Sequence, residues 1–148
     1  MENNKKISLS EDSPSVQAHL GILQNVIVRM ATNSTTTKTW CITLVSAILV
    51  VIADKGKPNY ALIALLPTIL FLMLDAYYLA MEKGFRNSYN EFVKKVHFGS
   101  LTPDDLYSVR PEKSMSKLQV EALRSVSVWG FYSFLGVMIL VAWYLLLT

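Results

Sequence analysis

Cysteine and histidine are scarce in this sequence, which limits the chemistry that it can carry. Cys41 is the single cysteine of the 148 residues, so no internal disulfide can form. It lies within an apolar run, where a thiol usually acts as a small hydrophobic side chain. Neither of the two histidines, His19 and His97, has a cysteine, histidine or carboxylate at metal-ligand spacing on its predicted helix. We therefore expect no zinc site.

Motifs for catalysis and nucleotide binding are also missing. The chain has no glycine-rich phosphate loop and no nucleophile signature of the common enzyme families. Asp104 and Asp105 are adjacent carboxylates, but they follow Thr102 and Pro103. Acids in the first turn of a short helix explain them better than a metal or acid–base role. We expect no enzymatic activity and no cofactor.

Charged residues are few for a chain of this length. They make up 17% of the sequence, and hydrophobic residues make up 52%, whereas a soluble domain carries about 25% charged residues. Membrane-embedded segments produce this shift, and 148 residues allow one domain. Residues 1–11 are polar and the first apolar run starts near Trp40, so we expect no cleavable signal.

Two apolar runs, residues 40–53 and 60–74, flank the polar loop DKGKPN. Gly56 and Pro58 in that loop break helix, so the segment reads as a transmembrane hairpin. A run of about 14 residues spans only about 21 Å, less than the roughly 30 Å thickness of the hydrocarbon layer. Either the flanking residues complete the span, with Lys38 reaching to the interface, or the hairpin inserts only partly.

Amphipathic stripes extend both helices beyond the apolar runs. Ser13-Pro14 is a helix start, and apolar residues then recur at helical spacing at Val16, Leu20, Leu23, Ile27 and Met30. A second stripe comprises Met81, Phe85, Tyr89, Phe92 and Val96, on a helix expected from about residue 59 to 97. The polar face of the first stripe carries only Arg29, which favours packing in a helix bundle over lying on the membrane surface.

Lys38 and Asp75 form a candidate interfacial ion pair. Lys38 lies sixteen residues before Asp54, and Asp75 lies fifteen after Tyr60, so the two sit at similar depth in an antiparallel hairpin. An acid at the membrane boundary normally faces protein or water and has a partner. The alternative is that Asp75 simply marks the end of the hydrocarbon zone.

Four further residues of the hairpin are candidate functional positions. Pro67 removes one helical hydrogen bond in the second run, so we predict a kink and a hinge there. Thr39, Thr43 and Ser46 fall on one side of the first run. Small hydroxyl residues let helices approach closely in lipid, which is the preferred interpretation, and a pore-lining stripe is the alternative.

The last apolar stretch, residues 126–147, carries no charged side chain and is the clearest spanning signal. We therefore expect an all-α integral membrane protein, in which a transmembrane helical hairpin extends into a cytosolic helical stalk and a C-terminal transmembrane helix follows. The predicted segments are a disordered N-terminus (1–12), a cytosolic amphipathic helix (13–38), the hairpin with its cytosolic extension (39–98), a cytosolic linker with short helices (99–125) and the C-terminal transmembrane helix (126–148).

The basic residues predict the orientation. Of the 14 lysines and arginines, only Lys55 and Lys57 lie in the tight loop. The positive-inside rule then places the N-terminus and the central segment in the cytoplasm and the C-terminus outside. Two spans with a reversed or peripheral hairpin are the alternative. A nucleotide or nucleic-acid contact has weak support from the basic residues Arg86, Lys94, Lys95 and His97.

The overall plan is carried by the stretch LQNVIVRMATNSTTTKTWCITLVSAILVVIADKGKPNYALIALLPTILFLMLDAYYLAMEKGFRNSYNEF. It resembles the small two-transmembrane effectors of bacterial defence systems, the SLATT-like class found with nucleotide-signalling and retron modules. The resemblance covers about half the chain, roughly residues 20–92, and is one of architecture rather than of a diagnostic motif. The third span departs from the two-helix plan.

This resemblance implies a protein of the bacterial inner membrane that contacts lipid, forms a homo-oligomer and permeabilises the membrane when triggered. The trigger would be a protein partner, a nucleotide or a nucleic acid from the same operon. No site residues carry over from the family. A hypothesis from another class is a non-conducting scaffold or accessory subunit that anchors a larger complex at the membrane.

Overall fold

A computed structural model describes residues 10–147 of the chain, apart from the side chains of Pro58, Leu146 and Leu147. Over these residues the protein is all-α, as predicted. The elements are α1 (Pro14–Lys55), the 3₁₀ helix η1 (Pro58–Ala64), α2 (Leu65–His97), the 3₁₀ helix η2 (Pro103–Asp105), α3 (Met115–Leu123) and α4 (Val126–Leu147). Residues 1–9, most of the predicted disordered N-terminus, lie outside the described residues.

Helix α1 runs without interruption through 42 residues, which makes it about 63 Å long. It begins at Pro14 with Ser13 in extended conformation before it, as the sequence predicts, and ends at Gly56 in the left-handed conformation. The boundary between the predicted segments 13–38 and 39–98 therefore falls inside one continuous helix. A helix of this length exceeds the roughly 30 Å hydrocarbon layer about twofold, so half of it must extend beyond the lipid.

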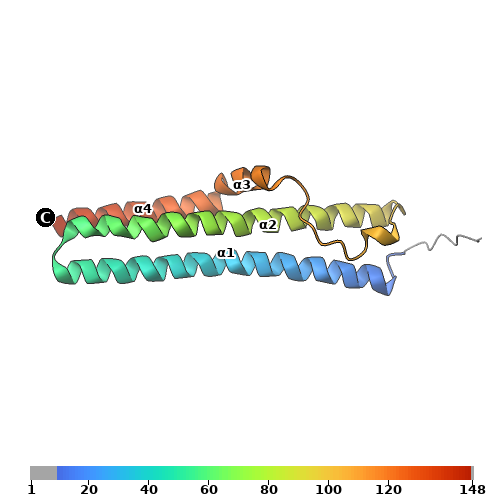
Figure 1. Cartoon of the computed structure of the whole chain (residues 1–148), viewed down its shortest axis with the longest axis horizontal. Helices are drawn as coiled ribbons and strands as arrows, with labels where there is room; N and C mark the ends of the chain where they lie inside the picture. The colour runs from blue at the N-terminus through green and yellow to red at the C-terminus, as the bar shows by residue number, and fades with distance from the viewer. Residues whose placement is uncertain (1–9, 148) are drawn as a thin grey trace, which may run out of the picture.

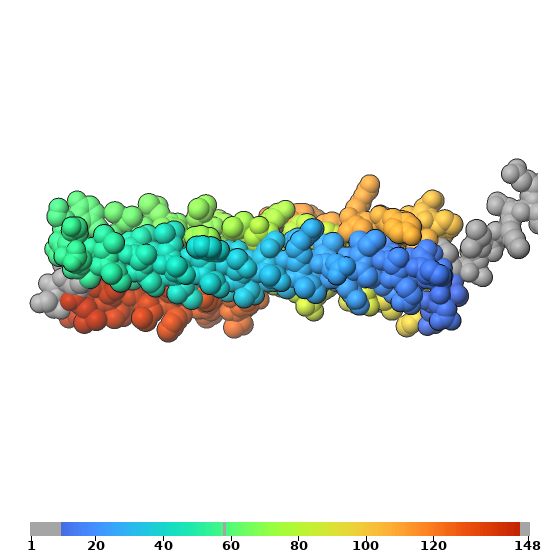
Figure 2. Space-filling model, turned by 90° about the horizontal axis from the view of Figure 1, so that it is seen from below, coloured from blue at the N-terminus to red at the C-terminus, as the bar shows by residue number. Residues whose placement is uncertain are grey.

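The hairpin divides the molecule into two halves along its length. Figure 1 shows α1 and α2 as a long antiparallel pair, with α4 alongside the half of α2 that adjoins the α1–α2 connection. In Figure 2, α1 runs the full length, α4 accompanies only that half, and residues of the α2–α3 segment cover the other end. We call the three-helix part the apolar half and the rest the stalk.

Three helical segments are long and apolar enough to cross a membrane: Pro14–Lys55, Asn59–His97 and Val126–Leu145. The apolar halves of the first two lie beside the third (Figure 1). The end of α4 reaches the tip of the hairpin, and the start of α1 lies at the opposite end of the molecule.

The stalk is held together by the two amphipathic stripes. Val16 and Leu23 of α1 and Phe85 and Phe92 of α2 are buried in one cluster, and further stripe residues pack on it, namely Leu20, Ile27, Met30, Met81, Tyr89 and Val96. The prediction that the first stripe packs in a helix bundle is confirmed, because its partner is the second stripe of the same chain.

The predicted kink at Pro67 is replaced by a change of helix type one turn earlier. Residues Pro58–Ala64 form a 3₁₀ helix, and the α-helix starts at Leu65, so Pro67 lies in its first turn. Proline suits the first turn because the N–H groups there have no acceptor within the helix, so the N–H that proline lacks costs no helical hydrogen bond. Thr68 Oγ1 donates a hydrogen bond of 2.8 Å to the Ala64 carbonyl, which satisfies one of the backbone oxygens at this junction.

Residues 98–114, which we call the strap, connect α2 to α3 and lie against the stalk. Leu101, Leu106 and Val109 of the strap pack on the stalk cluster. The short helix predicted at Asp104 and Asp105 is η2, and the N–H and Oγ1 of Thr102 before it donate to Asp105 Oδ2 at 2.9 and 2.8 Å. Arg124 and Ser125 separate α3 from α4, so the short helix of the predicted linker does not continue into the last span.

Candidate functional site

The structure places the two predicted ion-pair partners together at the border of the two halves. Lys38 Nζ lies 2.6 Å from Asp75 Oδ2, and the Asp75 side chain is fully buried while that of Lys38 is 18% exposed. Ser34, one turn before Lys38 on α1, donates a hydrogen bond of 2.5 Å to Asp75 Oδ1. Lys38 Nζ also donates to Ser34 Oγ at 3.1 Å. The three side chains form one closed polar group between α1 and α2.

Helix α4 completes the surroundings of this pair. The Lys38 ammonium lies 5.9 Å from the centre of the Phe131 ring, close enough for a cation–π contact. One turn along α2 from Asp75, the Phe71 carbonyl accepts a hydrogen bond of 3.0 Å from the Tyr132 hydroxyl. The pair therefore lies where all three apolar helices meet.

The chemistry of this site is compensation of a buried charge. Asp75 Oδ2 accepts no hydrogen bond of good geometry, so the Lys38 ammonium at 2.6 Å is its compensation. A buried carboxylate without a partner costs several kcal/mol. Sequence analysis found Lys38 and Asp75 but missed Ser34, although its spacing of four residues from Lys38 puts both on one face of the helix.

Thr39, Thr43 and Ser46 are all exposed on α1. They are not part of the contact face of α1 within the chain, which instead carries Ser34, Thr37, Cys41, Val45 and Ile52. At 100° per residue, positions 39, 43 and 46 fall opposite this contact face. Thr39 and Thr43 donate to the carbonyl four residues earlier, at 3.2 and 2.9 Å.

The outward faces of the other two apolar helices have a different composition. Exposed large side chains on α2 are apolar here, among them Leu66, Ile69, Leu70 and Met73, and those on α4 include Phe134, Val137, Met138 and Leu140. These are the residues that lipid tails accept. We define the hydroxyl face of α1 as Thr36, Thr39, Thr43 and Ser46, which are exposed on the same side of the helix as the apolar side chains of Ile42 and Val50.

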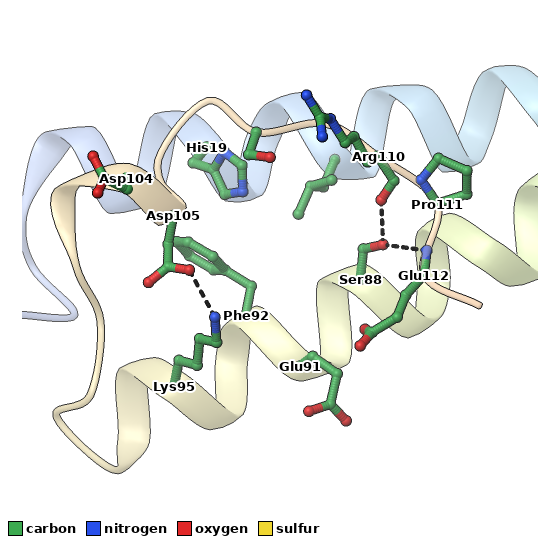
Figure 3. Close-up of a pocket in the computed structure, with 12 residues that line it drawn as sticks. His19, Ser88, Glu91, Phe92, Lys95, Asp104, Asp105, Arg110, Pro111 and Glu112 are labelled. Atoms are coloured by element: carbon green, nitrogen blue, oxygen red, sulfur yellow. Dashed lines mark hydrogen bonds and ion pairs between the residues drawn. The ribbon is translucent and has the colours of Figure 1, made fainter. Parts of the chain in front are cut away.

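A cleft of about 310 Å³ lies in the stalk between the strap and the two long helices (Figure 3). It is lined by side chains of both charges. Lys95 of α2 pairs with Asp105 of the strap at 2.6 Å. This lysine and the Thr102 backbone N–H lower the pKa of Asp105 to about 2. The ion pair ties the strap to α2 at one end of the cleft.

A glycine and a serine of α2 fix the other end of the strap. The Ser88 hydroxyl donates to the Arg110 carbonyl at 2.6 Å and accepts from the Glu112 N–H at 3.0 Å (Figure 3). At Gly84 an added Cβ would come within 2.7 Å of Pro111 Cβ, so only glycine allows this approach. Sequence analysis assigned Gly84 no role, because the strap that lies on it is remote in sequence.

His19 lies on the cleft wall beneath the strap and is fully buried (Figure 3). The Tyr107 backbone N–H donates a hydrogen bond of 3.0 Å to its Nδ1, and the ring centre lies 4.3 Å from that of Phe92. Burial lowers the pKa of His19, and the nearby Asp105 carboxylate opposes this shift in part. Sequence analysis missed this residue, although its place between Val16 and Leu23 on the apolar stripe is a signal of burial.

The structure does not gather the basic residues considered for nucleotide contact into one patch. Arg86, Lys94 and Lys95 each pair with a carboxylate, on Glu82, Glu91 and Asp105 respectively. Among residues 10–147, no group of three or more histidine, cysteine, aspartate or glutamate side chains could hold a metal ion.

Comparisons with protein-family models, with curated proteins and with solved structures found no match to this chain. The assignment of function therefore rests on the geometry above and on the resemblance in architecture.

Proposed function

We propose that this protein is the membrane effector of a bacterial defence system, a subunit that oligomerises in the inner membrane and forms a pore when triggered. The observation that carries the proposal is the hydroxyl face of α1. On a membrane helix of a monomer, that face would meet lipid, as would the exposed apolar faces of α2 and α4. Its difference from them favours a face that meets other copies of the chain or water.

The arrangement within an oligomer follows from which surfaces remain free. The two amphipathic stripes of the stalk are buried against each other, so they are not available to join copies. In the proposed oligomer, copies of α1 surround the axis with Thr39, Thr43 and Ser46 inward, and α2 and α4 face lipid. In this arrangement the hydroxyl face of α1 both packs against neighbouring copies and lines the pore.

The proposed topology puts the stalk in the cytoplasm and the tip of the hairpin outside. It is supported by the basic residues, which are concentrated in the stalk, and by the position of the end of α4 beside the tip. A trigger that comes from the same operon, whether a protein partner, a nucleotide or a nucleic acid, would act on the stalk. The resemblance to SLATT-like effectors supports this division of labour.

The test is thiol modification of an open channel on a Cys41→Ala background. Charged thiol reagents are expected to reduce the ion flux of Thr43→Cys at least severalfold, because the new thiol would lie on the water-filled path. Leu70→Cys on the outward face of α2 is the matched control and should be unaffected. Equal effects on both variants would contradict the lining role. Triggered cells that keep full membrane potential and grow normally would overturn the pore itself.

A non-conducting scaffold is the second candidate, and one observation favours it. Thr35, Thr37, Thr39 and Thr43 each donate to a carbonyl of their own helix, so these hydroxyls do not require water. Under this alternative, the protein anchors a larger complex. It predicts a stoichiometric partner on purification and no ion flux in liposomes.

A further inference from the structure

His19 connects the strap to the stalk through a bond that depends on its protonation state. A neutral imidazole has one nitrogen with a proton and one that accepts. Because the Tyr107 N–H donates to Nδ1, the proton of the neutral ring must be on Nε2. Protonation of Nδ1 would place two N–H groups against each other at 3.0 Å and remove the bond.

Tyr107 is held in a conformation that it would not adopt freely. Its φ of 61° lies in the left-handed region, which is unfavourable for a residue with a side chain. The hydrogen bond to His19 and the edge-on contact between the two rings, with centres 6.4 Å apart, hold it there. Loss of the bond therefore also allows the backbone of Tyr107 to relax, which favours release of the strap.

We propose that His19 is a pH-sensitive latch, whose protonation releases the strap from the groove between α1 and α2. The other attachments do not supply this sensitivity near neutral pH. Ser88 holds the strap through a hydroxyl that does not titrate, and the pKa of Asp105, at about 2, leaves it ionised. The latch belongs to the stalk and holds whether or not the apolar half conducts ions.

The charged groups around His19 come from both elements that pack on it. The strap contributes Asp104, Asp105, Arg110 and Glu112, and α2 contributes Glu91 and Lys95. Carboxylates outnumber cations, which favours a proton on the ring. However, Asp105 is paired with Lys95, and Glu91 with Lys94. Burial is thus the larger effect and lowers the pKa of His19 in the closed state.

The direction of the pH effect follows from the difference in the pKa of His19 between the closed and the open strap. With the strap open, His19 meets water and titrates near its ordinary pKa of about 6.5. The closed state binds a proton less readily, so opening takes up a proton below that pH. Closure is fully favoured above about pH 6.5 and weakens as the pH falls toward the pKa of the closed state. Within this window the open fraction rises by up to about tenfold per pH unit.

Release of the strap would change the surface of the stalk. Leu101, Leu106 and Val109 now cover the cluster that contains Leu23 and Phe92. Opening exposes this apolar seam to water along the two long helices. An acid-dependent apolar surface on the stalk is the expected result of the latch.

Hydrogen exchange of the full chain in detergent micelles, from pH 5 to 7.5, tests the latch. The variant is His19→Asn, whose side-chain oxygen takes the place of Nδ1 as an acceptor but does not titrate. Because the strap sequence is unchanged, its intrinsic exchange rates cancel when the two proteins are compared at the same pH. We expect equal protection above pH 7 and a loss in the natural chain of up to about tenfold per pH unit below pH 6.5.

The second histidine provides the control. His97→Asn, at the exposed end of α2, should keep the full pH dependence of the natural chain. Equal protection of the strap in the natural chain and in His19→Asn at every pH would overturn the latch. Loss of the pH dependence in His97→Asn would overturn it too. If His19→Asn does not fold, nuclear magnetic resonance of the natural chain decides. The His19 ring and the Tyr107 amide must then titrate together, and independent titrations would overturn the proposal.

Discussion

The same two helices are held together differently in the apolar half and in the stalk. In the apolar half, the buried residues of these two helices are mostly small, namely Cys41, Val45, Thr68, Ala76 and Ala80, although α1 also buries Ile52. In the stalk, their contact face is made of large residues, Leu23, Phe85 and Phe92. In lipid there is no hydrophobic driving force between apolar surfaces, so helices are held together by the close packing of small residues. In water, the hydrophobic effect drives large apolar side chains together.

The Lys38–Asp75 pair lies at the border between the packing of small residues in the apolar half and the burial of large side chains in the stalk. The Asp75 carboxylate is fully buried, whereas the Lys38 side chain is 18% exposed. The comparison thus teaches that this chain changes its means of stabilisation within single helices. Three predictions examine it, from the border to the stalk cluster and then to the strap.

The largest effect is expected at the border. Lys38→Gln leaves Asp75 buried without its counter-charge, which costs about 3–5 kcal/mol of unfolding free energy. Asp75→Asn weakens the association of α1 with α2 because it leaves the Lys38 ammonium without its carboxylate partner. The double variant has a neutral pair and should lose less than the sum of the two single losses. Equilibrium unfolding in detergent micelles measures all three.

An exposed pair on α2 provides the control for this experiment. Arg86→Gln breaks the contact with Glu82, and its arginine side chain is 62% exposed, so the loss should stay below about 1 kcal/mol. Strictly additive losses at Lys38 and Asp75 would remove the claim that the two act as a pair.

The second effect concerns the stalk cluster. Leu23→Ala removes a fully buried side chain and is expected to lower the free energy of unfolding by about 2–5 kcal/mol. Val28→Ala on the same helix is the control, because Val28 is 63% exposed and its loss should be within about 0.5 kcal/mol. Similar losses at the two positions, in the same unfolding experiment, would mean that burial of apolar side chains away from water does not stabilise the stalk.

The smallest effect is expected where the strap meets α2. In Gly84→Ala, the new Cβ would come within 2.7 Å of Pro111 and 3.0 Å of Leu118, so the strap must shift at a cost of about 1–3 kcal/mol. The better helix propensity of alanine offsets up to about 1 kcal/mol of that. Gly21→Ala, with no atom within 4 Å of the new Cβ, should instead stabilise α1. Thermal unfolding compares them, and a gain at both positions would show that the contact with Pro111 is loose.

Much of the fold could be predicted from local patterns. The stripe from Val16 to Met30, the start at Ser13-Pro14 and the charge-free last run each depend on residues within a few turns of one another. The Lys38–Asp75 pair was also accessible, since a tight loop fixes the register of an antiparallel hairpin. By contrast, local patterns did not decide which way Thr39, Thr43 and Ser46 face. A hydroxyl stripe suits a contact with the same chain as well as one with another chain.

The sequence by itself therefore determined the helical segments, the start of α1 and the pairing across the hairpin, because backbone hydrogen bonds and helical periodicity act over short separations. Only the tertiary structure decided which face of α1 turns outward, where Gly84 is needed and that His19 bonds to the strap. The reason is physical. Tyr107 and His19 lie 88 residues apart, and Ser88 and Arg110 lie 22 apart. No local preference specifies such contacts, which form only when packing brings the strap onto the stalk.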